Sequence, residues 1–279
     1  MATVPLLERS NLKLAVVGHV EWMTFAQVDA LPAAGRIAHA AGSLDQPAGG
    51  GAVCAVRMAQ LTGSRVIFFT ALGRDAIGRA CYDSLQELGL ELHVAWRDQP
   101  TRRGISMVDS DGDRAITVIG NRLQPEGMDS LPWGLLETCD GVFASAADAP
   151  ALQACRTARV MTATPRVRLH NLQQAGISLD ALISSGLDPG EQLPDELGFP
   201  SPNIQILTEG AEGGLCIPGG RYGASPPPGP CIDSYGCGDS FAAGVTAGLA
   251  AGLPIDACIG IGADAGAACS TWRGPYAPQ

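Results

Sequence analysis

The segment Asp233–Phe241 carries the residues best suited to chemistry in this chain. Its sequence is Asp-Ser-Tyr-Gly-Cys-Gly-Asp-Ser-Phe, so Asp239 directly follows a glycine-flanked turn and precedes an apolar stretch that we expect to be a helix. The N–H groups of such a turn, with the positive end of the helix dipole, can hold an anion. A carboxylate beside a bound phosphate can accept the proton of an attacking hydroxyl. The segment therefore predicts phosphoryl transfer, with an ordinary helix start and a first-turn acid as the alternative.

Composition and charge limit the kinds of protein to consider. The chain has 279 residues, of which 46% are hydrophobic, so it can form one sizeable core. We expect a single domain over residues 1–279. The formal net charge of -10 argues against nucleic acid or an anionic membrane as a partner, because both need a basic surface. A phosphorylated ligand would then depend on local N–H groups, a few arginines or a metal ion.

The cysteines and the apolar stretches bear on location. The nine cysteines form no Cys-x-x-Cys pair and have no His at zinc-ligand spacing, so a metal cluster is not expected. Glu8 and Arg9 precede any apolar run, so we expect no secretory signal and a cytoplasmic protein with reduced thiols. The weakly charged stretch 241–269 is interrupted by Pro254 and Asp264, which favours two buried helices over a membrane span.

Short apolar runs predict the buried parallel strands of an α/β fold that would position these residues. The expected strands are residues 14–18, 66–70, 141–144, 160–163 and 204–208, with helices at 52–61 and 149–158. Ligands of such sheets collect beyond the carboxyl ends of the strands. Residues 19–23 are therefore a candidate binding segment, in which we interpret His19 as structural because no acid accompanies it.

Residues 104–119 predict a hairpin, because apolar residues flank the turn sequence 109–113. We expect this hairpin to project from the main sheet. Together with a preceding segment it would form a small β lid from parts of 20–45 and 100–120. The arginines near this lid are interpreted as a solvated face, with a phosphate clamp as the alternative. They are Arg102, Arg103 and Arg114.

Taken together, these segments resemble the PfkB/ribokinase family of sugar and nucleoside kinases over nearly the whole chain. The family's carboxy-terminal signature, Asp-Thr-x-Gly-Ala-Gly-Asp-x-Phe, is similar to residues 233–241, with Ser and Cys in place of Thr and Ala. The resemblance implies an α/β, ribokinase-like three-layer αβα fold with a mostly parallel central sheet. It also implies that Asp239 is the catalytic base. The N–H groups around Gly236, Cys237 and Gly238 would then bind the transferred phosphoryl group.

The family's amino-terminal signature is recognisable but altered. Residues 48–53 stand where the family has Gly-Gly-x-Gly-x-Asn, and residues 72–78 match its Leu-Gly-x-Asp-x-x-Gly. Gly49 and Gly50 would let the backbone approach a hydroxylated ligand closely, with a plain helix-entry turn as the alternative. Val53 replaces an asparagine that usually hydrogen-bonds the sugar in the family.

A second departure lies at residues 18–23, where family members tend to read Gly-x-x-Asn-x-Asp. Met23 occupies the place of the sugar-binding Asp. Glu21 falls two residues earlier and could supply a carboxylate to the same site, with a solvated strand-end acid as the alternative. Trp22 could stack on a ring or belong to the core. The expected substrate-binding residues are Gly49, Gly50, Glu21, Met23 and Val53.

The nucleotide loop and the metal-binding residues are also implied by the resemblance. Thr208, Gly210 and Gly213 fall in a segment similar to the family's Thr-x-Gly-x-x-Gly loop, which lies against the nucleotide. Asp188 and Glu191 align with the family's Asn-x-x-Glu, which helps to organise Mg²⁺. Carboxylate oxygens suit this hard cation. An ordinary surface turn is the alternative for these two acids.

A monovalent cation is implied more weakly. Asp233 and the loop 268–274 fall where many relatives bind such an ion through carbonyl and carboxylate oxygens. The resemblance therefore adds K⁺ to the expected cofactors ATP and Mg²⁺. Relatives also often form dimers through their lids, so it implies a homodimer of this kind.

These residues predict ATP-dependent phosphorylation of a hydroxyl on a sugar, a related small polyol or a nucleoside. The alternative is a member of the same fold that binds a sugar or nucleotide without catalysis, because Val53 and Met23 replace polar residues of the family. A nicotinamide-dependent enzyme is not expected, since no Gly-x-Gly-x-x-Gly follows the first strand.

Overall fold

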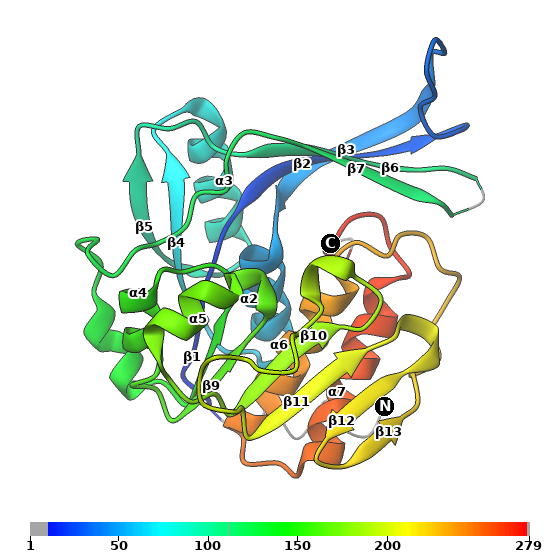
Figure 1. Cartoon of the computed structure of the whole chain (residues 1–279). Helices are drawn as coiled ribbons and strands as arrows, with labels where there is room; N and C mark the ends of the chain where they lie inside the picture. Colours follow the sequence, from blue (N-terminus) through cyan, green and yellow to red (C-terminus); the bar gives the residue numbers. More distant parts are fainter. Residues whose placement is uncertain (1–10, 111, 278–279) are drawn as a thin grey trace.

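A computed structural model describes residues 11–110 and 112–277 of the chain (Figure 1). The expectation about a secretory signal rests on Glu8 and Arg9, which lie outside the described residues. Asp111, in the turn of the predicted hairpin, lies outside them as well. Within these ranges, no helix combines the length and the apolar character that crossing a membrane requires.

A nine-stranded sheet forms the centre of the molecule. In spatial order its strands are β13 (Gly220–Tyr222), β12 (Gly214–Ile217), β11 (Ile204–Thr208), β10 (Ala181–Ser185), β9 (Val160–Ala163), β8 (Gly141–Ala144), β1 (Leu14–Val17), β4 (Ile67–Gly73) and β5 (Glu91–Arg97). The seven strands from β11 to β5 run parallel, and β12 and β13 are added in antiparallel fashion at one edge. The carboxyl ends of the parallel strands therefore meet at one end of the sheet.

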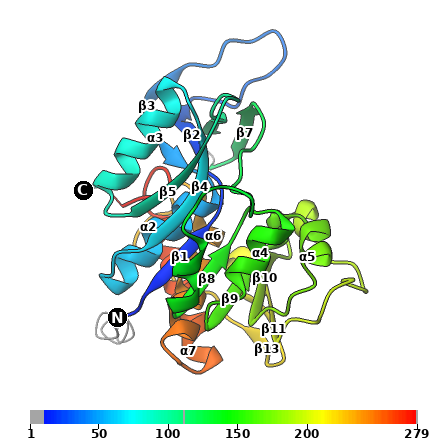
Figure 2. The same ribbon diagram turned by 90° about the vertical axis from the view of Figure 1, so that its left-hand side faces the viewer.

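Helices cover both faces of this sheet. One face carries α2 (Gly50–Thr62), α3 (Ala76–Glu87) and α6 (Cys237–Ala250), with α7 (Ile255–Cys269) packed against α6; the other carries α4 (Ala149–Cys155) and α5 (Leu169–Ala175). Figure 2 shows α2 and α3 on the opposite side of the strands from α4 and α5. Alternate residues of β1 feed the two cores, with Leu14 and Val16 in one and Ala15 and Val17 in the other, because successive side chains of a strand point to opposite faces. The predicted three-layer αβα fold with a mostly parallel sheet is confirmed.

A second sheet of four strands stands over the carboxyl ends of the large sheet (Figure 1). Its strands, in the order β3-β2-β6-β7, are β3 (Ala40–Ala48), β2 (Glu21–Val28), β6 (Arg103–Val108) and β7 (Arg114–Ile119). The expected hairpin is confirmed, since β6 and β7 pair in antiparallel fashion with Val108 opposite Arg114. This small sheet is one wall of the space in which the predicted site residues gather.

Local sequence explains where the helices beside the site begin. Asp75 caps α3, because its side chain accepts a hydrogen bond from the N–H of Gly78 at 2.6 Å. α2 begins inside the glycine run at Gly50 rather than at residue 52, and α6 begins after Gly236, whose φ of 81° suits glycine. Four short 3-10 turns complete the fold: η1 (Trp133–Thr138), η2 (Pro165–Val167), η3 (Pro189–Glu191) and η4 (Gly210–Glu212).

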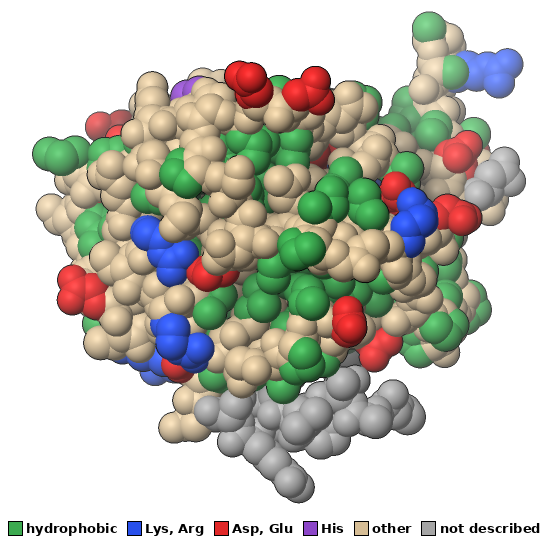
Figure 3. Space-filling view, turned by 60° about the horizontal axis from the view of Figure 1, so that its bottom comes forward, with side chains coloured by type: hydrophobic (Ala, Val, Ile, Leu, Met, Phe, Trp, Pro, Cys, Tyr) green, Lys and Arg blue, Asp and Glu red, His purple; other side chains and the backbone are tan. Residues whose placement is uncertain are grey.

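Charged side chains are dispersed on the face that Figure 3 presents, where acidic and basic groups lie singly or in small groups among hydrophobic and other residues. All nine cysteines are free thiols, and among them Cys231 is exposed and Cys237 partly exposed. Basic residues gather instead in the interior space between the two sheets, as described below.

Candidate active site

A cavity of about 710 Å³ lies between the two sheets, at the carboxyl ends of the parallel strands. Its wall combines strand ends of the large sheet, the starts of α2 and α6, and part of the small sheet. Of the predicted site residues, the wall includes Asp239, Gly236, Gly238, Gly49, Gly50, Glu21, Thr208, Gly210, Asp188 and Glu191. The predicted residues that do not belong to the wall are Cys237, Met23, Val53, Gly213 and Asp233.

Asp239 lies in the first turn of α6, on the wall of this cavity. The first N–H groups of a helix have no partner within the helix, and at this helix start they belong to the glycine-flanked turn. Burial raises the pKa of Asp239 to about 6. The positive charge of Arg166 acts to lower this pKa, and the negative charges of Glu191 and Glu21 act to raise it. The carboxylate is therefore ionised at neutral pH but holds a proton more readily than an exposed aspartate.

Two glycines at the start of α2 bring the backbone against Asp239. A Cβ added to Gly50 would lie 2.9 Å from Asp239 Oδ1. Gly49 has a φ of 92°, and a Cβ there would lie 3.0 Å from the His19 ring. The absence of side chains at these two positions keeps open the space in front of the carboxylate.

A chain of polar contacts joins the start of α2 to the small sheet. The N–H of Gly49 donates to the Tyr235 hydroxyl oxygen at 3.1 Å, and the Tyr235 hydroxyl donates to Glu21 Oε1 at 3.0 Å. Glu21 Oε2 forms an ion pair with Arg102 Nε at 3.1 Å. Burial and the charge of Glu21 hold the pKa of Tyr235 well above its usual value, so the phenol remains a donor. Glu21 is only 7% exposed, so it lies fixed at the cavity rather than solvated.

Met23 and Val53 belong to the hydrophobic core. Both side chains are completely buried, Met23 on β2 beside Gly104 and Val53 on α2 beside Gly236. Because neither side chain reaches the cavity, the structure gives no support to the prediction that they bind substrate. They fill apolar space behind the wall that Glu21 and Gly50 form.

Asp188 and Glu191 share one guanidinium, that of Arg166. Asp188 Oδ2 accepts from Arg166 Nη2, and Glu191 Oε1 accepts from Arg166 Nε. The second oxygens accept from backbone N–H groups, Asp188 Oδ1 from Gly190 at 2.8 Å and Glu191 Oε2 from Ser185 at 2.9 Å. Two neighbouring carboxylates are a donor set that fits a hard cation such as Mg²⁺. Such an ion would share these oxygens with Arg166.

The predicted nucleotide loop lies partly at the cavity. Thr208 ends β11, and Thr208 and Gly210 both line the wall. Gly213 does not line it; its φ of 82° serves the turn into β12, where a Cβ would collide with the carbonyl oxygen of Tyr222. The strand end and the start of η4 are therefore the parts of this loop that face the site.

Asp233 is buried behind the start of α6. Its Oδ1 accepts from the N–H of Tyr235 at 2.9 Å, and its Oδ2 accepts from the N–H of Gly274 at 3.1 Å. Arg114 Nη1 lies 4.0 Å from Oδ1. The carboxylate thus ties the segment before α6 to the loop 268–274, and a role toward a monovalent cation stays a prediction.

Several residues of the wall were not expected from the sequence. The interpretation of the lid arginines as a solvated face is wrong for Arg102 and Arg114, whose side chains are 21% and 31% exposed and which line the cavity. Arg122 and Arg166 also line the cavity, and neither belongs to a motif that the sequence analysis identified. Tyr235 lies inside the segment 233–241, so its position was a signal that could have been used.

His19 also lines the cavity, although we interpreted it as structural. Within the described part of the chain, its buried Nδ1 has no hydrogen-bond partner. Burial, followed by the positive charges of Arg122 and Arg102, holds the pKa of His19 well below its usual value. The ring is therefore neutral at physiological pH, beside Gly49 and Gly50.

Comparisons with known proteins show the family to which the chain is similar. A family model for the pfkB family carbohydrate kinases matches residues 11–175 and 195–279. Acarbose 7(IV)-phosphotransferase of Actinoplanes sp. is 40% identical over 73 residues, 24% of this chain. The chain spans only 24% of that curated relative in the match.

Solved structures share the fold over nearly the whole length. Arabidopsis thaliana ribokinase complexed with ribose and ATP has a TM-score of 0.75 and 20% identity, and the match covers 94% of each chain. The adenosine kinase of Sinorhizobium meliloti has a TM-score of 0.75 and 17% identity, with 95% of each chain covered. At these identities the likeness is one of fold.

Proposed function

Because the chain belongs to the pfkB family of carbohydrate kinases, we propose that it transfers a phosphoryl group from ATP to a hydroxyl of a sugar, a related small polyol or a nucleoside. The observation that carries the proposal is the position of Asp239. This acid lies on the cavity wall at the glycine-flanked start of α6, with the backbone of Gly50 against its carboxylate. Phosphoryl transfer to an alcohol is favoured where a base for the hydroxyl proton and N–H groups that bind the phosphate lie at the same place.

Asp239 acts as the general base in this proposal. With a pKa of about 6 it is ionised near neutral pH, yet it is basic enough to take the proton as the acceptor hydroxyl attacks the phosphorus. The proton moves from the hydroxyl to Asp239, and the bond between the γ-phosphorus and the bridging oxygen of ATP breaks as the new P–O bond forms.

The start of α6 and Arg166 stabilise the charge on the transferring group. The N–H groups around Gly236, Cys237 and Gly238 lie at the helix start, where that of Cys237 makes only a long contact of 3.5 Å with the carbonyl oxygen of Ser234, and the helix dipole adds to their effect. Fixed donors of this kind lower the barrier because they need no reorganisation during the reaction. Arg166 is held beside the cavity by two carboxylates, so its cation is positioned in advance.

The acceptor lies against Gly49, Gly50 and Glu21 in this proposal. Glu21 can accept hydrogen bonds from hydroxyl groups, and Tyr235 keeps it in place. Met23 and Val53 act behind this wall, where they fix its shape rather than touch the acceptor. The ribokinase of Arabidopsis thaliana, which shares this fold and is complexed with ribose and ATP, supports the proposal of a small hydroxylated acceptor.

ATP would lie against Thr208 and Gly210, with Gly213 shaping the turn. Asp188 and Glu191 would hold Mg²⁺ beside the phosphates of ATP, where the ion would offset the negative charge of the phosphates. The proposal extends, on the family resemblance, to K⁺ near Asp233, to a cytoplasmic location and to a homodimer through the small sheet. Exposed apolar residues on that sheet, Leu44 and Ile119, are consistent with such a contact.

The competing function is a sugar or nucleotide binder that does not catalyse. The two are separated by incubating the protein with MgATP and a panel of acceptors that includes ribose, adenosine and acarbose, and by measuring ADP release and thermal stability together. ADP release that depends on an acceptor and is lost in Asp239→Asn supports the kinase. Stabilisation by an acceptor without any ADP release would support the binder instead.

A further inference from the structure

A second cavity, of about 510 Å³, adjoins the first and is lined by arginines. Its lining includes Arg102, Arg122, Arg166 and Arg168 and contains no acidic residue. The first three of these arginines line the main cavity as well, so the two spaces are adjacent. Four cations around one space stand out in a chain whose net charge is -10. We name these four residues the arginine cluster.

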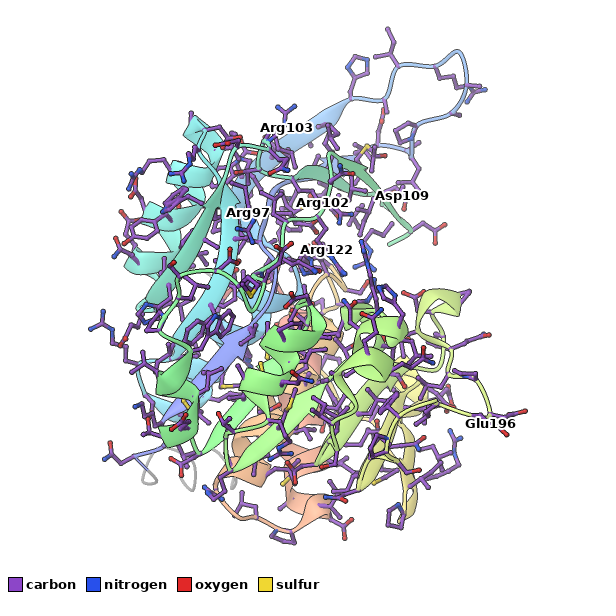
Figure 4. The ribbon with its side chains drawn as sticks, turned by 60° about the vertical axis from the view of Figure 1, so that its left-hand side comes forward. Arg97, Arg102, Arg103, Asp109, Arg122 and Glu196 are labelled. Atoms are coloured by element: carbon purple, nitrogen blue, oxygen red, sulfur yellow. The ribbon has the colours of Figure 1, made fainter. Side chains whose placement is uncertain are left out.

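The arginine cluster lies between the small sheet and the segment 165–169, which follows β9 of the large sheet. Arg102 directly precedes β6 and Arg122 follows β7 by three residues. Figure 4 shows Arg102 and Arg122 near one another in the space between the small sheet and the body below it, with Arg103 farther up on the small sheet. Through Glu21, Arg102 is also joined to Tyr235 and so to the start of α2. Arg102 therefore connects the cluster to the wall on which the acceptor is proposed to lie.

Two members of the cluster are balanced by acids and two are not. Arg102 pairs with Glu21, and Arg166 pairs with Asp188 and Glu191. Among the described residues, no acid lies within ion-pair distance of Arg122 or Arg168. An unbalanced cation beside like charges is costly unless an anion completes the group.

Arg122 is the member of the cluster whose charge and hydrogen-bond donors are least satisfied. Its Nη1 donates to the carbonyl oxygen of Arg166 at 2.7 Å, whereas its buried Nε has no partner within the described part of the chain. Burial, followed by the positive charges of Arg168 and Arg102, lowers the pKa of Arg122 to about 10. A buried donor without a partner costs free energy in the folded state, and a bound anion would satisfy it.

We infer that the arginine cluster binds an anionic group of the acceptor, a phosphate or a carboxylate, so that the substrate is a sugar or polyol that already carries negative charge. This inference rests on the proposed function, because it assigns the acceptor of the same site. The fork of a guanidinium matches both anions in a bidentate arrangement. One molecule in the main cavity can reach both Asp239 and the cluster, since Arg102, Arg122 and Arg166 line that cavity as well.

The nucleotide is the other possible source of an anion, and the lining argues against it. Neither Thr208 nor Gly210, the nucleotide residues at the main cavity, contributes to the second cavity. The residues around the cluster come from the ends of the small sheet and from the segment 165–169, together with Gly190 and Gln192 beside Glu191. The phosphates of ATP have their own donors at the start of α6, and of the four arginines only Arg166 is shared with the transferring group.

The test compares neutral acceptors with relatives that carry a phosphate or a carboxylate. Ribose is compared with ribose 5-phosphate, fructose with its 1-phosphate and 6-phosphate, and glycerol with glycerate, with ADP release as the readout. We expect kcat/KM to be at least about 100-fold higher for the charged member of one or more pairs, because a neutral acceptor leaves the buried Nε of Arg122 without a partner. Inorganic phosphate should inhibit in competition with the acceptor and not with ATP.

Two variants locate the effect. Arg122→Gln and Arg168→Gln should each lower kcat/KM for the charged acceptor by about 10- to 100-fold and change KM for ATP less than twofold. Arg65→Gln removes the same charge from an exposed site, where the side chain is 69% exposed, and should change neither. Because Arg168 is exposed, its replacement should leave folding intact even if that of Arg122 does not.

The outcomes separate this inference from the proposed function. Equal use of neutral and charged acceptors, or competition of phosphate with ATP alone, would overturn the inference and leave the kinase in place. If no acceptor is phosphorylated, the proposed function fails. Thermal stabilisation of the protein by inorganic phosphate then shows whether the arginine cluster binds an anion. Stabilisation that is lost in Arg168→Gln but kept in Arg65→Gln would support the site, and no stabilisation of the wild type would overturn it.

Discussion

The backbone of Gly50 and the carboxylate of Asp239 lie against each other, so that a Cβ on residue 50 would stand 2.9 Å from Oδ1. This contact joins the start of α2, which belongs to the acceptor side of the site, to the start of α6, which belongs to the phosphoryl side. The two halves of the proposed reaction meet at one carboxylate.

Gly50→Ala tests whether this close approach matters. The added Cβ must displace the tip of the Asp239 side chain, and misplacing a catalytic group by about 1 Å can cost about 100-fold. We therefore expect kcat to fall by about that factor. The free energy of unfolding should change by less than about 1 kcal/mol, because alanine is favoured over glycine in a helix.

Gly260→Ala is the matched control, since Gly260 also lies in a helix and a Cβ there would meet no atom within 4 Å. Its activity should equal that of the wild type. Unchanged kcat in Gly50→Ala would show that the close approach of Gly50 does not fix the catalytic position of Asp239.

Asp239→Asn tests the general base. The amide keeps the shape of the side chain but accepts no proton, and loss of a general base typically lowers the rate by about 10²–10⁴-fold. We expect ADP release to fall by this factor while ATP still binds, as measured by calorimetry. Asp256→Asn, an exposed first-turn acid of α7, serves as the control and should retain full activity.

The pH dependence of kcat should report the raised pKa of Asp239. Because the base must be ionised, activity should fall as pH drops through about 6, by about tenfold per pH unit below it. Glu191 is one of the negative charges that raise this pKa, so Glu191→Gln should move the midpoint to lower pH. A profile that stays flat down to pH 5 would show that Asp239 does not limit the rate as a base.

The same carboxyl should affect stability in the opposite sense to activity. Its pKa is raised from 3.8 in an unfolded chain to about 6, so the folded protein binds this proton more tightly and loses stability as pH rises from about 4 through about 6. Asparagine does not titrate. Asp239→Asn should therefore be about 1–3 kcal/mol more stable than the wild type at pH 8 and nearly equal to it at pH 4. Urea denaturation at the two pH values measures this difference.

Glu191→Gln tests the proposed metal site. The change removes a carboxylate that accepts from Arg166 and from the N–H of Ser185. We expect the Mg²⁺ concentration for half-maximal activity to rise at least about tenfold, and the free energy of unfolding to fall by about 1–3 kcal/mol. Glu196→Gln, an exposed acid that Figure 4 places away from the site, should alter neither value. An unchanged Mg²⁺ requirement would remove Glu191 from the metal site.

Local patterns predicted the fold well because its strands are short apolar runs and its site glycines are clustered. β11 and β8 have the expected bounds, and α2 and α6 begin at the glycines that the sequence singled out. β5 and β10 were not predicted. The first mixes charged and aromatic residues, and the second ends in serines, so neither reads as a plain apolar run.

The arginine cluster could not be predicted in the same way. The four arginines come from three separate segments, at residues 102, 122 and 166–168, and arginines are mostly solvated, so nothing local separates Arg122 from Arg65. Their meeting depends on how the small sheet sits over the large one. Met23 shows the reverse case, since alignment with a family motif placed it at the substrate while its apolar side chain is buried in the core.

The hydrogen bond from Tyr235 to Glu21 spans 214 residues of sequence, and this separation bears on how the chain acquires activity. During synthesis, β1 and the small sheet emerge long before Tyr235 does, so Glu21 lacks this donor until the last part of the chain is present. Contacts between such distant segments form slowly, because the loop between them must first close. Recovery of phosphoryl transfer during refolding should therefore lag behind the recovery of helix content.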